Sequence, residues 1–125
     1  MIMVIDDDFH ITDMLDALLR QVGYDTAIAG DGDRALESLS RGRLPQLILL
    51  DLGLPSRDGF MVLDAVKNDP QTKNIPVLVI SGQDTVAEVD KAIGMGAAEF
   101  VPKPLKSERL LLKIRRHLSG SGPAA

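Results

Sequence analysis

The sequence contains neither cysteine nor tryptophan, and aromatic residues make up only 3% of its 125 positions. Without cysteine the chain can form no disulfide framework, no thiolate zinc site and no cysteine nucleophile. The scarcity of aromatic rings and a formal net charge of −4 argue against a nucleic-acid surface built on base stacking. No apolar run approaches the ~18 residues of a membrane helix, and no signal peptide precedes Asp6. These absences predict a globular domain located in the cytoplasm.

The remaining composition is that of an ordinary folded domain, with 45% hydrophobic and 26% charged residues. A chain of this length buries about two thirds of its surface on folding, which is enough for one core. We expect a single domain over residues 1–118. Residues 119–125 read Ser-Gly-Ser-Gly-Pro-Ala-Ala, a composition typical of flexible chain, and they form either a solvated tail or the start of a linker.

Five short apolar segments alternate along the chain with five segments of helical spacing. The predicted strands span residues 2–5, 25–29, 47–50, 76–80 and 100–101. The helical stripes are marked by Ile11, Met14, Leu15, Leu18, Leu19 and Val22; by Ala35, Leu36 and Leu39; by Phe60, Leu63 and Val66; by Val86, Val89 and Ile93; and by Leu110, Leu111, Ile114 and Leu118. Asp8 and Ser107 are the expected N-caps of the first and fifth helices.

This alternation predicts an α/β fold, a doubly wound (βα)5 flavodoxin-like sandwich. The third and fourth strands are apolar on both faces, as parallel strands covered by helices on each side must be. Crossovers between parallel strands are right-handed, and we expect an open five-stranded sheet in the order 2-1-3-4-5. In such a sheet ligands bind beyond the carboxyl ends of the strands, at the switch point between the first and third strands.

Acidic residues stand at this switch point. Asp6 and Asp7 follow the first strand, and Asp51 follows the third. Because neighbouring parallel strands end at the same edge of a sheet, we expect the three carboxylates to converge there. Two unit charges 4 Å apart repel by about 4 kcal/mol at an effective dielectric of about 20, so a fold tolerates them only if a cation or a function compensates. Carboxylate oxygens without His or Cys suit Mg²⁺, with Mn²⁺ as the alternative ion.

A hydroxyl and an ammonium are expected at the same edge. Ser81 ends the fourth strand, and Lys103 follows the fifth. A carboxylate nucleophile, a divalent metal, a lysine and a hydroxyl are together the groups needed for phosphoryl transfer onto an aspartate.

Four separated motifs carry a resemblance to a known family. They are Val4-Ile5-Asp6-Asp7-Asp8; Leu49-Leu50-Asp51-Leu52-Gly53-Leu54-Pro55 with Asp58-Gly59; Val79-Ile80-Ser81-Gly82; and Phe100-Val101-Pro102-Lys103-Pro104. With these motifs in order over about residues 2–118, the chain resembles the receiver (phosphoacceptor) domain of bacterial two-component response regulators.

The resemblance implies a role for each acidic residue. Asp51 would be the phosphoacceptor, and Asp6 and Asp7 would form the acidic pair of the metal site. Asp7 would be a direct Mg²⁺ ligand, beside Asp51 and the backbone carbonyl of Gly53. The domain would not be an enzyme acting on a separate substrate, but would catalyse its own phosphorylation and dephosphorylation.

The resemblance also implies a conformational switch. Ser81 would hydrogen-bond the acyl phosphate, Lys103 would pair with it, and the Lys103–Pro104 peptide bond would be cis. Phe100 takes the place of the switch aromatic, which rotates inward when Ser81 moves toward the phosphate. The output surface would lie around the fourth helix, fifth strand and fifth helix, because phosphate adds contacts available in only one of two packings.

The implied partners follow from this role. Upstream stands a sensor histidine kinase or a phosphotransfer protein, and downstream an effector domain, a separate protein or a phosphorylation-dependent homodimer. Neither nucleic acid nor a membrane is an expected direct partner. Gly53 and Gln83 depart from the commonest family pattern at positions that modulate phosphate lifetime, so the resemblance leaves the hydrolysis rate open.

Other interpretations explain less of the sequence. Gly30-x-Gly32-x-x-Ala35 has the form of a dinucleotide-binding fingerprint, but Asp31 and Asp33 would face the pyrophosphate with negative charge. Asp6-x-Asp8 matches only a fragment of the haloacid-dehalogenase phosphatase signature. The serious alternative is a degenerate receiver that acts as an unphosphorylated interaction module.

Overall fold

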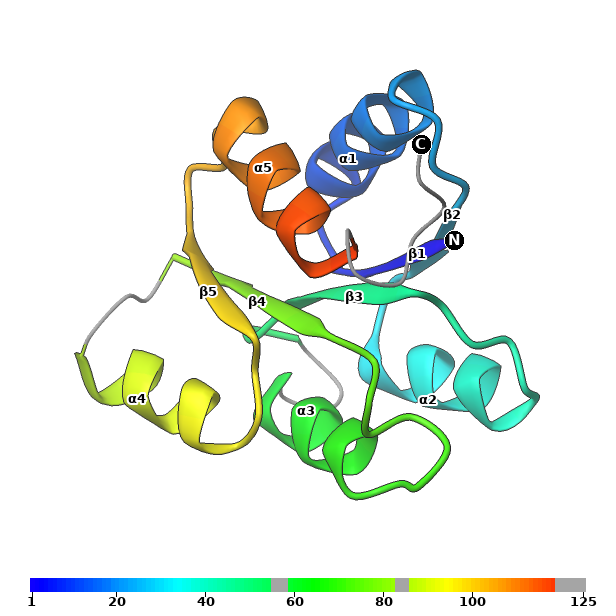
Figure 1. Cartoon of the computed structure of the whole chain (residues 1–125), viewed down its shortest axis with the longest axis vertical. Coiled ribbons are helices and arrows are strands. Elements are labelled where there is room, and N and C mark those ends of the chain that lie inside the picture. Colours follow the sequence, from blue (N-terminus) through cyan, green and yellow to red (C-terminus); the bar gives the residue numbers. More distant parts are fainter. Residues whose placement is uncertain (55–58, 83–85, 119–125) are drawn as a thin grey trace.

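The computed structural model describes residues 1–54, 59–82 and 86–118. Strands and helices alternate strictly in this part of the chain (Figure 1). Their bounds are β1 (Ile2–Ile5), α1 (Phe9–Gln21), β2 (Thr26–Ala29), α2 (Gly32–Ser40), β3 (Leu47–Asp51), α3 (Gly59–Lys67), β4 (Val77–Ser81), α4 (Val86–Gly94), β5 (Glu99–Pro102) and α5 (Ser107–Leu118). Within these ranges, no helix has the length and apolar character needed to cross a bilayer. The predicted tail, residues 119–125, lies outside the described residues.

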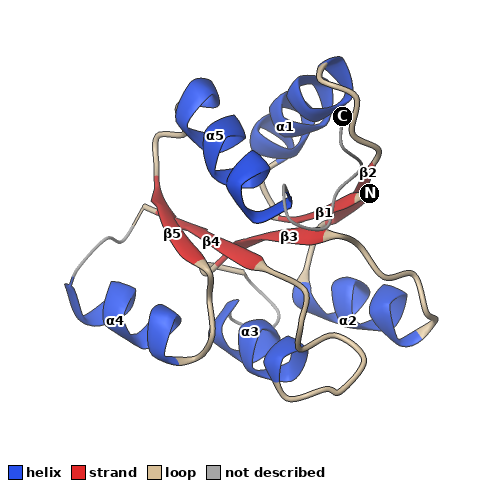
Figure 2. Ribbon diagram, in the orientation of Figure 1, coloured by secondary structure: helices blue, strands red, loops and turns tan. Residues whose placement is uncertain are grey.

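The strands form one parallel sheet in the order β2-β1-β3-β4-β5, which confirms the predicted fold class and strand order. Val4 in β1 pairs with Ile28 of β2 on one side and with Leu49 of β3 on the other. Helices α1 and α5 cover one face of the sheet, and α2, α3 and α4 cover the other (Figure 2). The switch in strand order therefore falls between β1 and β3, as expected.

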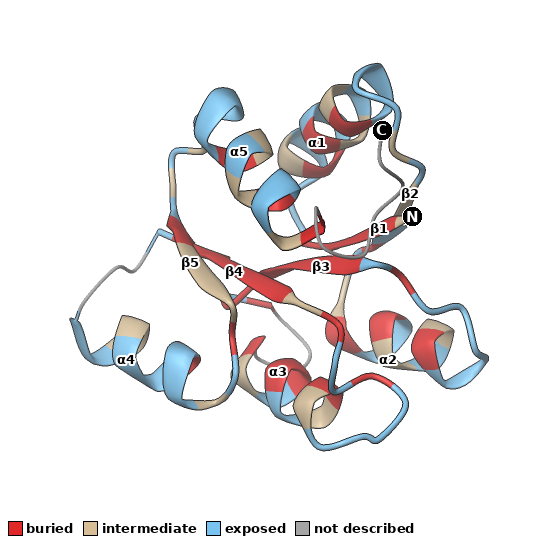
Figure 3. Ribbon diagram, viewed as in Figure 1, coloured by how far each residue is buried: buried red, intermediate tan, exposed pale blue. Residues whose placement is uncertain are grey.

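The sheet separates two apolar clusters, and alternate residues of the central strands enter opposite ones. Met3, Ile5, Ile48 and Leu50 pack on the side of α2 and α3. On the side of α1 and α5, the strand residues are joined by helix residues that include Leu15, Leu19, Leu110 and Ile114. Strands β1, β3 and β4 are buried along their whole length (Figure 3). Burial on both faces explains why these strands are continuous apolar runs.

The predicted N-caps have different outcomes. Asp8 caps α1 as expected, since its side chain accepts a hydrogen bond of 2.9 Å from the backbone N–H of His10. Ser107 was the wrong residue for α5, because it is already the first helical residue. The carbonyl of Lys106 accepts the N–H of Leu110, and the helical bonding therefore begins one residue earlier than the hydroxyl signal indicated.

Helix α4 exists as predicted, but two of the three apolar residues that mark it are exposed. Val86 is 77% exposed and Ile93 is 46% exposed, whereas Ala92 is the buried residue of this helix. The helix lies beside the edge strand β5 (Figure 1). Because the sheet ends there, it can bury only a narrow part of the helix surface. Periodicity thus predicted the helix correctly, although only Val89 among the residues that mark it is partly buried.

Gly59 is the first residue of α3 and packs directly against the end of β3. Its N–H donates a hydrogen bond of 2.8 Å to the carbonyl of Leu52. A Cβ atom at this position would lie 2.6 Å from the carbonyl oxygen of Asp51 and closer still to the Cα atom of Leu52. Backbone atoms cannot rotate away as a side chain would, so only glycine lets the chain return this close to Asp51.

We expect Gly59→Ala to lower the free energy of unfolding by about 3 kcal/mol, because overpacking against backbone forces β3 and α3 apart. Gly30→Ala is the matched control, since nothing lies within 4 Å of a Cβ atom at Gly30. The control should change stability by less than about 1 kcal/mol. Urea denaturation of the three proteins measures the difference, and equal stability of the two variants would contradict the close approach at Gly59.

Candidate functional site

Three carboxylates meet at the carboxyl edge of the sheet. Asp6 directly follows β1 and Asp51 ends β3, and these strands are neighbours. Ligand oxygens of Asp6, Asp7 and Asp51 all lie within 4.8 Å of one another. Asp6 is 3% exposed and Asp51 is 7% exposed, whereas Asp7 faces solvent. The convergence predicted from strand order is confirmed.

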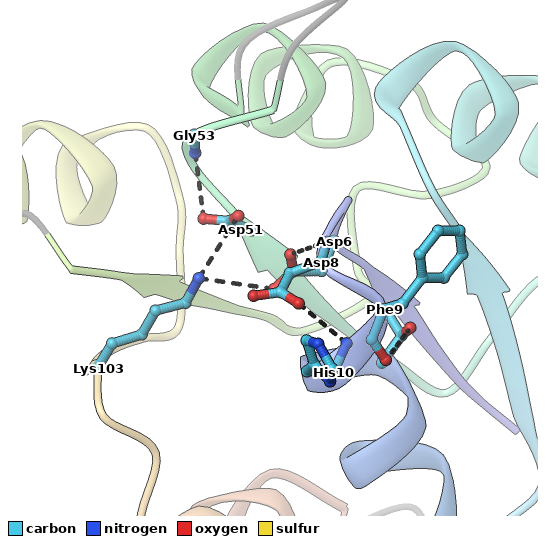
Figure 4. Close-up of polar contacts among 8 residues, drawn as sticks. Asp6, Asp8, Phe9, His10, Asp51, Gly53 and Lys103 are labelled. Carbon is cyan, nitrogen blue, oxygen red and sulfur yellow. Dashed lines mark hydrogen bonds and ion pairs between the residues drawn. The ribbon is translucent and has the colours of Figure 1, made fainter.

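Backbone N–H groups hold the two buried carboxylates in place. The N–H of Asp8 donates to Oδ1 of Asp6 at 3.0 Å, and the N–H of Gly53 donates to Oδ1 of Asp51 at 3.1 Å (Figure 4). Each donor lies two residues beyond its acceptor, in the turn that leaves the strand. The sequence predicted Asp8 only as a helix cap, although a short run of aspartates after a strand also permits this local turn.

Lys103 reaches into the cluster from the end of β5. Its Nζ lies 3.7 Å from Oδ2 of Asp6 and 3.6 Å from Oδ2 of Asp51 (Figure 4). The Lys103–Pro104 peptide bond is cis, and the backbone N–H of Lys103 donates to the carbonyl of Ser81 at 3.0 Å. Within residues 1–54, 59–82 and 86–118, Lys103 is the cation that pairs with these carboxylates, and it contacts two of the three.

Burial is the main reason why Asp6 holds its proton more tightly than an ordinary aspartate. It raises the pKa of Asp6 from 3.8 to about 6, against the lowering effect of the hydrogen bond from Asp8. The negative charges of Asp51 and Asp7 raise the pKa further, and Lys103 opposes them. Crowding of the carboxylates therefore contributes as expected, but removal of Asp6 from water contributes more.

The cluster has the donor chemistry of a site for a hard divalent cation. Its ligand atoms are carboxylate oxygens, and neither His nor Cys belongs to the cluster. Mg²⁺ is held in proteins by one or two carboxylates with additional oxygens from water and phosphate. Asp6, Asp7 and Asp51 can therefore bind a metal ion at this edge of the sheet.

Ser81 and Phe100 lie on the two strands beyond Asp51. Ser81 ends β4, is almost fully buried and pairs with Pro102 in β5. Phe100 pairs with Val79 and is only partly buried, packing at the margin of the core on the side of α4. The strand order places both residues on the β4–β5 side of Asp51, while Gln83 lies outside the described residues.

Comparison with known proteins agrees with this geometry. A family profile described as the response regulator receiver domain matches residues 2–115. The chain belongs to this family. The receiver domain is 34% identical over 117 residues to the DNA-binding response regulator MtrA of Mycobacterium tuberculosis, covering 94% of this chain and 50% of MtrA. It is 36% identical to the response regulator PleD of Caulobacter vibrioides, covering 91% of this chain and 25% of PleD.

Solved structures show the same architecture. The receiver domain of NtrX from Brucella abortus superposes with a TM-score of 0.88 at 36% identity, covering 97% of this chain and all of that one. The chemotaxis response regulator CheY4 of Vibrio cholerae gives a TM-score of 0.87 at 28% identity, covering 94% and 97% of the two chains. The receiver domain therefore spans half or less of the curated relatives described above, but nearly the whole of these two structures.

The raised pKa of Asp6 predicts how the stability of the metal-free receiver domain depends on pH. Between pH 3.8 and about 6 the folded state binds more protons at Asp6 than the unfolded state does. The penalty for a buried charge is therefore present at neutral pH and is relieved as pH falls through about 6. In the presence of a chelator, we expect stability to rise by about 1.4 kcal/mol between pH 7.5 and pH 5.

Asp6→Asn isolates this effect, because the amide oxygen can still accept the N–H of Asp8 but carries no charge. The variant should lose the rise in stability, as measured by urea denaturation at each pH. Asp16 does not interfere, because hydrogen bonds from Thr26 and Arg20 lower its pKa and its contribution is lost only below pH 3.8. The same rise in the variant would assign the effect to another group.

Proposed function

We propose that Asp51 accepts a phosphoryl group in a Mg²⁺-dependent reaction and that this domain is the switch of a two-component signalling pathway. The observation that carries the proposal is the placement of Asp51. Its carboxylate is buried at the end of β3, is oriented by the N–H of Gly53, and lies 3.6 Å from the Lys103 ammonium beside two further carboxylates. An aspartate that served only as a helix cap would need neither the ammonium nor the two further carboxylates beside it.

In the proposed reaction an oxygen of Asp51 attacks the phosphorus of a phosphohistidine or an acyl phosphate. A P–O bond to Asp51 forms while the P–N or P–O bond of the donor breaks, and the imidazole or carboxylate of the donor departs with the electron pair. Mg²⁺ bound by Asp6, Asp7, Asp51 and the Gly53 carbonyl would neutralise charge on the transferred group. The Lys103 ammonium pairs with a phosphoryl oxygen, and the Ser81 hydroxyl donates to another.

In this proposal, the bond between Asp51 and the phosphoryl group is hydrolysed at the same site. A Cβ atom built on Gly53 would meet nothing nearer than Oδ1 of Asp51, at 3.8 Å, so no side chain at this position shields the acceptor. Water can therefore approach Asp51 from the side of Gly53. The domain would catalyse both its own phosphorylation and its own dephosphorylation.

The output would be a change of packing around α4, β5 and α5. Phe100 is only partly buried, and the apolar side chains of Val86, Ile93 and Leu112 are exposed on the flanking helices. Contact of Ser81 with the phosphoryl group would favour the packing in which Phe100 turns inward. The exposed apolar side chains on both helices support the proposal that this surface binds different partners in the phosphorylated and unphosphorylated states.

The partners in this proposal are a cytoplasmic sensor kinase or phosphotransfer protein as donor, and an effector domain, a separate protein or a second copy as the output. MtrA is a DNA-binding response regulator, and this chain matches only half of its length. The proposal assigns DNA binding to no residue of this chain. The retained set of Asp51, Asp7 and Lys103 favours it over an unphosphorylated interaction module.

Acetyl phosphate with Mg²⁺ should add one phosphoryl group to the wild-type protein, because the acceptor, the metal ligands and Lys103 are already assembled. Asp51→Asn should abolish the addition, and an excess of chelator should prevent it. Asp13→Asn, at an exposed position of α1, is the matched control and should be labelled normally. Intact-mass spectrometry measures the product. Undiminished labelling of Asp51→Asn or of the chelated protein would overturn the assignment.

Phosphorylation should also change amide hydrogen exchange at Ile93–Val101 and Leu110–Arg116, because the proposed movement of Phe100 repacks β5 against its neighbours. Hydrogen-exchange mass spectrometry compares the phosphorylated and unphosphorylated protein, with α2 as the internal control. Phe100→Ala should retain labelling of Asp51 but lose the change at these segments. Changes confined to the loop after Asp51 would leave the receiver phosphorylated without the proposed output.

A further inference from the structure

The two edge strands of the sheet, β2 and β5, differ in how their outer backbone groups are covered (Figure 1). At β5 the N–H of Lys103 bonds to the carbonyl of Ser81 on the neighbouring strand. Because successive residues of a strand alternate, the backbone groups of Phe100 and Pro102 point outward. Pro102 has no N–H, and the carbonyl of Phe100 accepts a hydrogen bond of 3.4 Å from Nζ of Lys113. This edge is therefore partly closed to a further strand.

The outer edge of β2 has no such protection. The carbonyls of Asp25 and Ala29 accept hydrogen bonds of 2.8 and 3.1 Å from N–H groups at the start of β1 and just beyond its end. The alternate residues, Thr26 and Ile28, therefore direct their N–H and C=O groups away from the sheet. In residues 1–54, 59–82 and 86–118, these outward groups have no hydrogen-bond partner. The strand also contains neither proline nor charge, the features that usually block an open edge.

Ile28 adds an apolar side chain to this open edge. It pairs with Val4 of β1, which is buried in the apolar cluster beneath α1. Residues that pair in register lie on the same face of a sheet, so Ile28 lies on the α1 side, yet it is 47% exposed. A strand added beyond β2 would bring a side chain beside Ile28 and remove this apolar surface from water.

Acidic residues stand at both ends of the same edge. Asp25 precedes β2, Asp31 and Asp33 follow it, and no Lys or Arg occurs between Gln21 and Asp33. Arg34 lies 3.7 Å from Asp31 and offsets that charge, whereas Asp25 and Asp33 are exposed. This charge favours a partner strand with basic ends. A second copy of the chain would instead bring the same carboxylates to the interface.

We propose that the outer edge of β2 binds an extended segment of a partner protein, which adds to the sheet as a further strand. The segment would bond to the outward backbone groups of Thr26 and Ile28 and cover the Ile28 side chain with an apolar residue. Its basic ends would face Asp25 and Asp33. In the order β2-β1-β3, β1 separates this edge from Asp51, so the interaction needs neither the phosphoryl group nor the surface around α4, β5 and α5.

The test is binding of the fluorescently labelled peptide Lys-Thr-Val-Thr-Val-Thr-Lys to the unphosphorylated full chain, measured by anisotropy at low salt. Ile28→Lys should weaken binding about tenfold, because it removes the apolar contact and places a charge at the edge. Leu44→Lys is the matched control, since Leu44 is 45% exposed and lies in the loop between α2 and β3. The same change of charge there should weaken binding less than about twofold.

The backbone contacts have a separate readout. In hydrogen exchange followed by NMR, the peptide should slow the amides of Thr26 and Ile28, which point outward, more than the amide of Ala27, which faces β1. Ile28→Pro removes one outward N–H without removing a bond to β1, so this variant should keep the fold and also lose affinity for the peptide.

Four results would overturn the proposal. They are no peptide binding by the wild type, equal binding by Ile28→Lys and Leu44→Lys, slowed exchange at β5 without slowing at β2, and a wild-type dimer that Ile28→Lys dissociates. The last result, measured by sedimentation velocity, would assign the edge to a second copy. Ile28 and Leu44 lie outside the acidic cluster, so labelling of Asp51 by acetyl phosphate should continue in each variant. That control separates failure of this proposal from failure of the proposed phosphorylation.

Discussion

The burial and crowding of carboxylates at Asp6, Asp7 and Asp51 is the constraint on which the functional site depends. Two of these carboxylates are buried, and a single ammonium from Lys103 lies near both of them. The fold keeps this unfavourable arrangement because parallel strands β1 and β3 end side by side and leave little freedom to move apart. A bound cation or a phosphoryl group interacts with a site that is already assembled, and so the ligand need not order it.

The supports of this site come from the backbone more than from side chains. N–H groups of Asp8 and Gly53 hold the buried carboxylates, and the N–H of Lys103 bonds to the carbonyl of Ser81. Gly59 allows α3 to return against the end of β3 without displacing Asp51. Because these hydrogen bonds come from the backbone next to each carboxylate, the two buried side chains are held where the strands end.

The sequence predicted the strand order and the convergence of the carboxylates, because continuous apolar runs and strand-end aspartates report directly on a covered parallel sheet. It did not predict the exposure of Val86 and Ile93, since periodicity shows which residues are apolar but not how much sheet lies beneath the helix. The sequence also placed the N-cap of α5 at Ser107, one residue later than the structure has it. The dominance of burial at Asp6 required coordinates, because the extent of desolvation depends on every element around the group.

Strand β5 connects the acidic cluster with the margin of the core beside α4. Phe100 lies at the core margin toward α4, Val101 and Pro102 line a cavity between β5 and α5, and Lys103 extends to the acidic cluster. Four consecutive residues thus contact three environments that differ in charge and polarity. A displacement of this strand toward Ser81 would alter all three at once, because the residues are covalently linked and the strand is short. A partner that binds one packing of β5 would then favour or oppose phosphorylation of Asp51, and phosphorylation would change the affinity for that partner by the same factor.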